Sequence, residues 1–227
     1  MKLLAFEFSC ERASVALRLG GETRLRWLEG HANHSEYVLA AARSLLAEGG
    51  LGIGALDAVA FGAGPGAFTG LRLACGVAQG LALGAGLGVI PVCSLAALAA
   101  QSPRPLALAA TDARMGEIYH GRYRIENGLP LELAAPACCA PEALPPPGDE
   151  YFGLGSAFAA CETSLATLRA SLAGCDPLAL PSAETIARLA AEAGEADIVP
   201  PECAAPLYVR NKVALTTAER LARGSKA

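Results

Sequence analysis

Short apolar runs separated by turn residues open the chain and predict three β-strands. The runs cover Lys2–Phe8, Ala13–Leu19 and the segment TRLRWLE, and Gly20-Gly21 is typical of a tight turn between the last two. Because both connections are short, neighbouring strands should run antiparallel. The chain is therefore expected to begin with a three-stranded meander.

Helical and strand-like patterns then alternate. From His34 to Glu48 apolar residues recur along one helical face, and Gly49-Gly50 ends the pattern. The segment LDAVAFGAG predicts a strand, Phe68 to Leu83 a helix, GVIPVCS a strand and LAALAA a further helix. The order up to GVIPVCS is thus β–β–β–α–β–α–β, which contains a β–β–β–α–β–α unit.

The second half repeats this plan. It begins at about Arg104 with a strand, a turn at Asp112–Gly116 and a second strand, and an Asn-Gly turn leads into a third. A proline-rich connector, PEALPPPGDE, is expected on the surface before another strand and two helical segments. The acids Glu7 and Asp112 fall at matching points of the two halves. We therefore predict an α/β fold of two related lobes, residues 1–103 and 104–227, and leave open whether the tail packs back on the first lobe.

A glycine-rich stretch, FGAGPGAFTG, lies between a predicted strand and a predicted helix, where phosphate-binding turns occur. The dinucleotide pattern is met only formally, since Pro65 lacks an N–H group and no acid lies between Asp57 and Asp112 to hold a ribose. The P-loop pattern fails because no lysine occurs between Lys2 and Lys212. We therefore expect no nucleotide loop and no cofactor.

The helix from Phe68 is apolar or small on every face, and glycine recurs every fourth residue from Gly76 to Gly88. Such a row lets another helix approach closely, and it also marks membrane helix pairs. Arg72 and Gln79 disfavour a membrane span. An ordinary core helix needs only one apolar stripe, so the extra apolar surface favours a partner helix.

Composition narrows the class of protein. Net charge is −4 and no basic stripe is visible, so RNA binding by this chain alone is not expected. None of the eight cysteines forms a C-x-x-C pair, which disfavours a zinc site and favours reduced thiols. The opening MKLLAFEFSC superficially resembles a lipoprotein signal, but Glu7 interrupts its short apolar run. We expect a cytoplasmic protein.

Four motifs occur in order along the chain: HSEYVLAAARSLLAEGGL, GPGAFTGLRLACG, DARMGEIY and PLYVR. They resemble patterns of the TsaB family of tRNA threonylcarbamoyladenosine biosynthesis proteins, whose signature G-P-G-S-F-T-G-L-R-I-G is similar to GPGAFTGLRLACG. The resemblance implies an actin-like ATPase (ASKHA, ribonuclease H-like) fold with two β–β–β–α–β–α lobes. It also implies a non-catalytic partner of a TsaD-type catalytic subunit, with a TsaE-type ATPase joining the assembly. The chain alone should form a homodimer, and the partner should chiefly engage the tRNA.

In that family the partner surface is a pair of helices in the N-terminal lobe, which correspond here to the helices from His34 and from Phe68. Replacing Ala78 or Gly80 by arginine should then abolish association and leave thermal stability nearly unchanged. The resemblance places the following residues at the interface: His34, Tyr37, Val38, Ala41, Leu71, Arg72, Ala74, Cys75, Ala78, Gly80 and Leu81.

The catalytic paralogue carries an H-x-x-x-H metal motif, and matching VCSLAALA to it places Ser94 and Leu98 at the two histidine positions. Neither side chain can replace an imidazole ligand, so neither a metal site nor a catalytic residue is expected. A glycoprotease would need a metal or nucleophile constellation, which three histidines and scattered cysteines do not provide.

Two acids are candidates for a relic nucleotide cleft. In actin-like ATPases an acid after the first strand helps to organise metal and phosphate, and Glu7 and Asp112 occupy such positions. The chain departs from its family here, with Glu7 for Asp, Phe8 for Thr and Ala67 for Ser. The alternative function is therefore an ATP- and magnesium-dependent transferase that uses these two acids. The structural alternative is a pair of acids at strand ends near solvent.

Three further polar features have simple interpretations. His31 and His34 resemble a pair of metal ligands but lack a third ligand nearby, so loop and helix-cap roles are favoured. Arg72 is a candidate to bind an anion or a partner carboxylate, because a buried charge needs a partner. Arg114 is expected to pair with Asp112 or Glu117.

Overall fold

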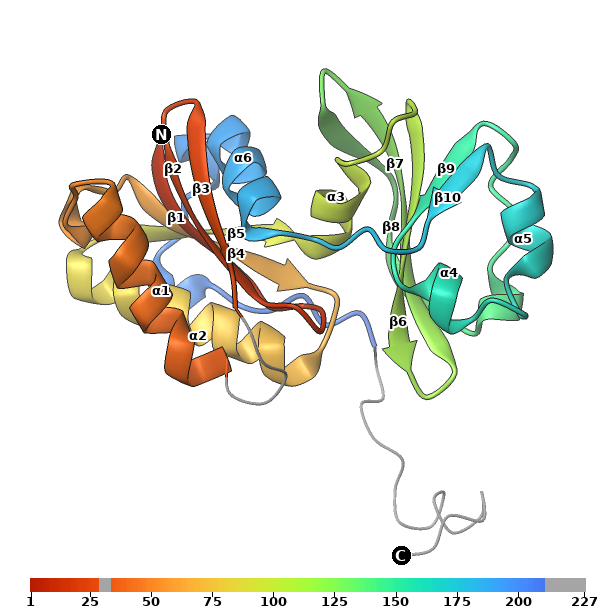
Figure 1. Ribbon diagram of the computed structural model, residues 1–227, viewed down its shortest axis with the longest axis horizontal. Coiled ribbons are helices and arrows are strands. Elements are labelled where there is room, and N and C mark those ends of the chain that lie inside the picture. Colours follow the sequence, from red (N-terminus) through yellow and green to blue (C-terminus); the bar gives the residue numbers. More distant parts are fainter. Residues whose placement is uncertain (29–33, 211–227) are drawn as a thin grey trace, which may run out of the picture.

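The computed structural model describes residues 1–28 and 34–210 and shows two lobes side by side, each built on a five-stranded sheet (Figure 1). The first sheet has the order β3-β2-β1-β4-β5, and the second has the equivalent order β8-β7-β6-β9-β10. In each lobe the first three strands pair antiparallel, and the last two are added in parallel. The strands are β1 (Lys2–Glu7), β2 (Ser14–Leu19), β3 (Glu22–Trp27), β4 (Ala58–Gly64), β5 (Gly88–Cys93), β6 (Leu106–Arg114), β7 (Glu117–Glu126), β8 (Leu129–Cys139), β9 (Tyr151–Leu154) and β10 (Gly174–Asp176). This equivalence confirms the predicted duplication.

The helices follow the predicted positions. They are α1 (His34–Glu48), α2 (Phe68–Ala85), α3 (Ser94–Ala99), α4 (Ala157–Ala160), α5 (Ala166–Ala170) and α6 (Ala183–Ala193), with short 3-10 turns at Ile53–Ala55, Pro141–Ala143, Glu195–Asp197 and Pro201–Cys203. Helix α2 ends where Gly86 adopts a left-handed conformation, which glycine tolerates without strain. Helix α6 begins where the Ser182 hydroxyl accepts a hydrogen bond from the Thr185 N–H group.

Strand β1 explains why the chain opens with an unbroken apolar run. It lies at the centre of the first sheet and is buried on both faces. Leu4 and Phe6 pack in the cluster that α1 and α2 cover, whereas Leu3 and Ala5 pack in the cluster that includes α6 (Figure 1). A strand covered on both faces needs apolar residues at successive positions rather than at alternate ones.

The two lobes exchange one helix each. Helix α3 follows the last strand of the first sheet but packs against β6 and β7 of the second. Helix α6 follows the last strand of the second sheet but packs against β1, β2 and β4 of the first. Each sheet is therefore completed by a helix from the other half of the chain.

The second lobe departs from the first at one place. The fully described segment between β8 and β9 contains only the 3-10 turn Pro141–Ala143, where the first lobe has the helix α1. This segment carries Pro141, Pro145, Pro146 and Pro147, and proline in a helix interior lacks the N–H donor and clashes with the preceding turn. The β–β–β–α–β–α pattern is thus incomplete in the second half.

Helix α2 is the one helix in the described part of the chain that is long and apolar enough to cross a membrane, by length and composition alone. Mostly buried core helices of soluble proteins pass the same test. Here the covered face packs inside the first lobe and consists of Leu71, Ala74, Cys75, Ala78 and Ala82.

Candidate functional site

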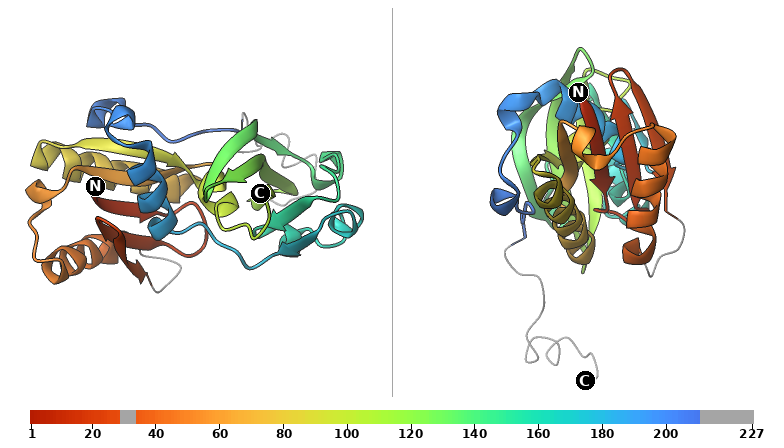
Figure 2. Two further views of the ribbon diagram at one scale, coloured as in Figure 1. Left: turned by 90° about the horizontal axis from the view of Figure 1, so that it is seen from above. Right: turned by 90° about the vertical axis from the view of Figure 1, so that its left-hand side faces the viewer.

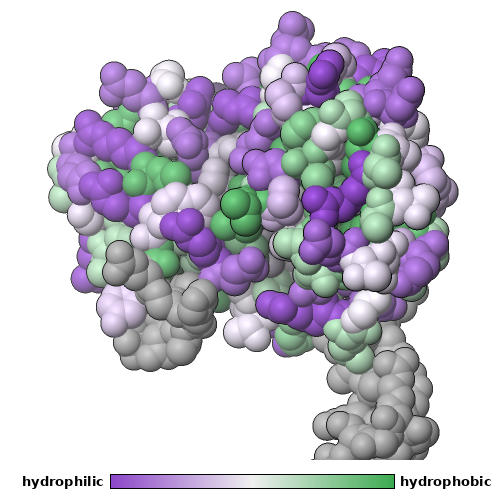
Figure 3. All heavy atoms as spheres, turned by 45° about the vertical axis from the view of Figure 1, so that its right-hand side comes forward, coloured by the Kyte–Doolittle hydropathy of each residue, from purple (hydrophilic) through white to green (hydrophobic). Residues whose placement is uncertain are grey.

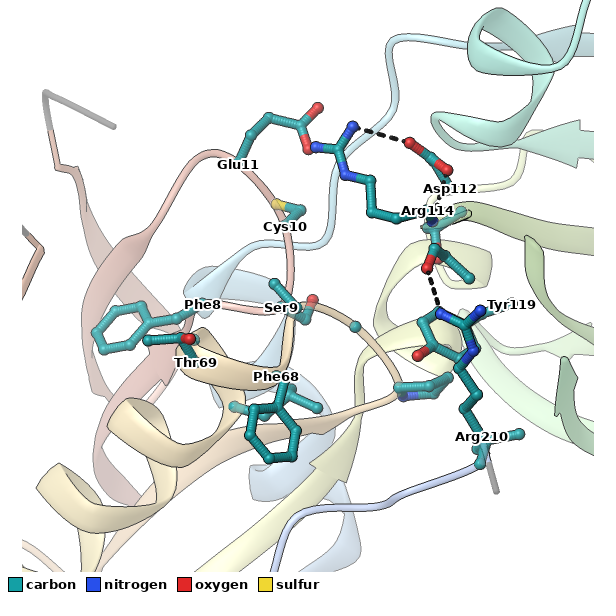
Figure 4. Close-up of a pocket in the computed structure, with 18 of the residues that line it drawn as sticks. Phe8, Ser9, Cys10, Glu11, Phe68, Thr69, Asp112, Arg114, Tyr119 and Arg210 are labelled. Atoms are coloured by element: carbon teal, nitrogen blue, oxygen red, sulfur yellow. Dashed lines mark hydrogen bonds and ion pairs between the residues drawn. The ribbon is translucent and has the colours of Figure 1, made fainter. Parts of the chain in front are cut away.

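The glycine-rich turn before α2 is filled by the chain's own backbone. A Cβ atom added at Gly66 would overlap the carbonyl oxygen of Ser9, and one added at Gly70 would overlap that of Phe8. The Ala67 N–H group donates a 2.8 Å hydrogen bond to the same Ser9 oxygen. The glycines therefore let the turn after β1 lie directly against the start of α2 (Figure 4). The glycines therefore have a structural role that requires no bound phosphate.

Glu7 is buried, with both carboxylate oxygens bonded inside the first lobe. The Ser9 N–H group donates to Oε1 at 2.6 Å, and the Ser94 hydroxyl donates to Oε2 at 2.7 Å. A Cβ atom at Gly62 would overlap Oε2, so glycine at this position makes room for the acid. Burial raises the pKa of Glu7, and the hydrogen bonds from Ser9 and Ser94 oppose that effect. The expectation that both acids lie at strand ends near solvent is therefore wrong for Glu7.

A cleft of about 700 Å³ lies between the lobes, and Glu7 is not part of its lining. Its walls include the turn after β1, the start of α2, the β6–β7 hairpin and the segment Leu207–Arg210 (Figure 4). Asp112 lies in the cleft, where its carboxylate accepts a 2.8 Å hydrogen bond from the backbone N–H group of Arg114 and a 3.0 Å hydrogen bond from the Arg114 guanidinium. This ion pair confirms the predicted partner of Arg114.

The charged groups of the cleft do not form a metal site. Its two lining arginines are both in ion pairs, Arg114 with Asp112 and Arg210 with Glu117. Within residues 1–28 and 34–210, no group of three or more His, Cys, Asp or Glu side chains is arranged to hold a metal ion. The two acids Glu7 and Asp112 are thus not brought together as ligands of one ion.

The positions matched to the paralogue's histidines lie in the interior. Ser94 begins α3 and is occupied by its hydrogen bond to Glu7. Leu98 packs with Ala107 and Tyr123 between α3 and the second sheet. These two side chains stabilise the junction between the lobes.

The predicted partner surface on α1 and α2 divides into buried and exposed residues. Tyr37, Arg72 and Gly80 are exposed, and Ala41 and Leu81 are half-buried. The remaining described members are core residues whose side chains are unavailable to a partner in this structure, which corrects the predicted set; they are Val38, Leu71, Ala74, Cys75 and Ala78. His34 is the first residue of α1, but its side chain lies outside the described part of the chain.

The structure adds residues that the sequence did not single out. Leu83 on α2 is 72% exposed and Leu39 on α1 is 44% exposed. A groove of about 380 Å³ lies between the two helices and is lined mainly by apolar residues, including Leu39, Leu46, Ile53 and Leu81. Both helices lie on the same face of the first sheet (Figure 1). The sequence signal that could have identified Leu83 is its place outside the one apolar stripe that a core face of α2 would use.

Arg72 is bound within the chain rather than free. Its guanidinium lies 3.7 Å from the centre of the Phe68 ring, and its Nε atom donates a 3.0 Å hydrogen bond to the Tyr208 hydroxyl.

His31, the other predicted metal-ligand candidate beside His34, lies outside the described residues.

Two lobes with one strand order, a cleft between them and exchanged helices define a protein of the actin-like ATPase (ASKHA) class. A family model described as "TsaD: tRNA N6-adenosine threonylcarbamoyltransferase" matches residues 29–216. The TsaB protein of Haemophilus influenzae is 36% identical over 94% of this chain and 95% of its own length, and that of Escherichia coli is 34% identical over 94% and 96%. The chain belongs to the TsaB family, within this wider TsaD family.

Solved structures agree with this assignment. YeaZ from Pseudomonas aeruginosa is 36% identical and superimposes with a TM-score of 0.81, covering 91% of this chain and 100% of that one. A second structure, described as similar to peptidase YEAZ from the same organism, has a TM-score of 0.83 over 92% of this chain and 99% of that one.

Proposed function

We propose that this chain is a non-catalytic scaffold and activator subunit in the formation of threonylcarbamoyladenosine in tRNA. The names of its TsaB relatives support a part in this biosynthesis. In the proposed assembly the chain binds a TsaD-type catalytic subunit, and a TsaE-type ATPase joins them. The tRNA is engaged chiefly by the catalytic subunit, consistent with a net charge of −4 here.

The observation that carries the proposal is the exposed apolar surface of α1 and α2. Leu39 and Leu83 are large apolar side chains that project from neighbouring helices, and an apolar groove runs between those helices. Exposed apolar surface of this kind marks protein interfaces, because leaving it in water is costly. On the face that Figure 3 shows, groups of hydrophobic residues also lie among hydrophilic ones.

The same surface supports self-association of the chain alone. A homodimer formed through α1 and α2 would use the patch that a TsaD-type partner later covers, so the two assemblies should compete. A role in tRNA modification also favours the cytoplasm as the location.

Size-exclusion chromatography with light scattering tests this function. The chain of 23.0 kDa is measured alone and then mixed with the TsaD-type protein of the same genome. We expect a homodimer that is replaced by a complex containing both proteins. A monomer that ignores the TsaD-type protein would contradict the proposal.

The alternative is an ATP- and magnesium-dependent transferase that uses Glu7 and Asp112. The burial of Glu7 and its bonds to Ser9 and Ser94 weigh against it, since a metal-organising acid must face the cleft. ATP hydrolysis by the purified chain that is lost on Glu7→Gln, in a variant that remains folded, would favour the transferase instead.

A further inference from the structure

The chain's last described segment crosses from one lobe to the other. We call residues Ala204–Arg210 the strap. It follows Val199, which pairs with Val89 through two hydrogen bonds of 2.9 Å at the edge of the first sheet. The strap then runs past α2 toward β6, as Figure 1 and the left view of Figure 2 show.

The strap is bonded to the first lobe along its length. Gln79 of α2 donates to the carbonyl oxygen of Ala204 at 3.1 Å, and the Leu207 N–H group donates to the oxygen of Ala63 at 2.8 Å. Tyr208 adds side-chain contacts. Its hydroxyl accepts a hydrogen bond from Arg72, and its ring centre lies 5.8 Å from that of Phe68.

At its far end the strap is bonded to the second lobe. The guanidinium of Arg210 donates a 3.2 Å hydrogen bond to the Ala113 carbonyl oxygen and forms an ion pair with Glu117. The Arg210 side chain is only 15% exposed, so this pair is less screened by water than a surface pair. Ala113 lies in β6 between Asp112 and Arg114, which line the cleft, and Glu117 begins β7, so both partners adjoin the β6–β7 turn (Figure 4).

The other two connections between the lobes run together. The segment after α3 and the segment between β10 and α6 are joined by a 2.9 Å hydrogen bond from Gln101 to the carbonyl oxygen of Leu180. In the left view of Figure 2 the β10–α6 connection and the strap lie on opposite sides of the molecule. Two lobes joined on one side alone can open about that side, whereas a third connection on the opposite side restrains them.

We propose that the strap restrains the two lobes on either side of the cleft and so fixes the position of the β6–β7 turn opposite the start of α2. Leu207, Tyr208 and Arg210 themselves line the cleft, so the strap is also one of its walls. Loss of the Arg210 contacts frees the second lobe while the bonds of Leu207 and Tyr208 keep the strap on the first. This restraint by the strap does not depend on the proposed function, and its test uses the chain alone.

The test is amide hydrogen exchange, followed by mass spectrometry, on the Arg210→Ala variant. We expect exchange about three- to tenfold faster in peptides that cover the β6–β7 turn and the turn after β1, as for loss of a partly buried hydrogen-bonded pair. Peptides from β1 and β4 should exchange as in the unaltered protein. Arg124→Ala is the matched control, because Arg124 pairs at 3.4 Å with Glu126 within the second lobe.

A second variant keeps the test decisive if Arg210→Ala does not fold. Tyr208→Phe retains the ring against Phe68 but removes the hydroxyl that accepts from Arg72. It should give the same pattern of faster exchange at a smaller amplitude. Unchanged exchange at both turns, or an equal rise in every peptide, would overturn the proposal, since the first shows no restraint and the second shows a loss of overall stability.

Discussion

The Ser94 hydroxyl donates a 2.7 Å hydrogen bond to the carboxylate of Glu7, which has no contact with solvent. Ser94 begins the helix that the first lobe contributes to the second sheet, and Glu7 ends the central strand of the first sheet. The bond therefore stabilises the junction between the lobes. An acid at the position that organises metal in actin-like ATPases is here part of the protein core.

The stability of the protein should depend on pH through Glu7. Burial raises its folded-state pKa above the ordinary value of 4.5, so above that pH the folded state retains a proton that the unfolded state has released. Stability should therefore fall as pH rises through the interval between the two pKa values. Glu7→Gln lacks this titrating group, so its stability should not show this fall. The Tm of Glu7→Gln minus the Tm of the unaltered protein should therefore increase as pH rises above about 4.5.

Calorimetry between pH 4 and 8 measures this difference. Glu126→Gln, which removes the charge of an exposed acid, is the control for the loss of one negative charge. Parallel curves for Glu7→Gln and the unaltered protein would contradict a raised pKa of Glu7.

The burial of Glu7 could not be predicted from the sequence. It depends on the missing side chain of Gly62 on the neighbouring strand and on Ser94, 87 residues away in the chain. The succession of strands along the chain, by contrast, could be predicted, because apolar runs, short turns and the matching positions of Glu7 and Asp112 all indicated a duplicated unit.

The exchange of helices and the faces of α2 also required the structure. The amphipathic pattern of α6 indicates that one face is buried, but it does not say which sheet covers that face. On α2, small apolar residues occupy every face, so Ala78 in the core and Gly80 in solvent look alike in the sequence. Only packing against β4 distinguishes them.

Two glycines of α2 should respond in opposite ways to alanine. Gly70→Ala places a methyl group on the Phe8 carbonyl oxygen and should lower the free energy of unfolding by about 1–3 kcal/mol. Gly84→Ala, its matched control, meets nothing within 4 Å and should raise the free energy of unfolding by about 0.5–1 kcal/mol. Urea denaturation of both variants measures the two changes. Equal effects would mean that the turn after β1 does not pack on α2 as described.

Leu83 should be essential for binding the TsaD-type subunit. Leu83→Arg adds a charge to the exposed apolar face of α2 and should weaken the complex at least about tenfold, because a buried unpaired charge costs more than the lost contact. Its Tm should change little, since the side chain is 72% exposed. Isothermal titration calorimetry measures the affinity.

The matched control for that change is Leu178→Arg. Leu178 is 82% exposed in the connection between β10 and α6, away from the groove, and its replacement should leave binding unchanged. Ala78→Arg is unsuitable as a test because Ala78 is fully buried and the variant should unfold, contrary to the expectation from sequence. Equal affinities of the Leu83 and Leu178 variants would place the interface elsewhere.

Thiol reactivity should separate Cys203 from Cys10. Burial raises the pKa of Cys10 from 9.0 to about 12, and the thiolate is the form that iodoacetamide alkylates. At pH 8 a rise of three units lowers the thiolate fraction about a thousandfold, since each unit is a factor of ten.

Cys203 is exposed and should be labelled first, whereas Cys10 should remain unmodified over the same time. Mass spectrometry of proteolytic peptides measures both sites, and labelling in denaturant should make their rates similar. Rapid labelling of Cys10 in the folded protein would contradict a raised pKa of its thiol.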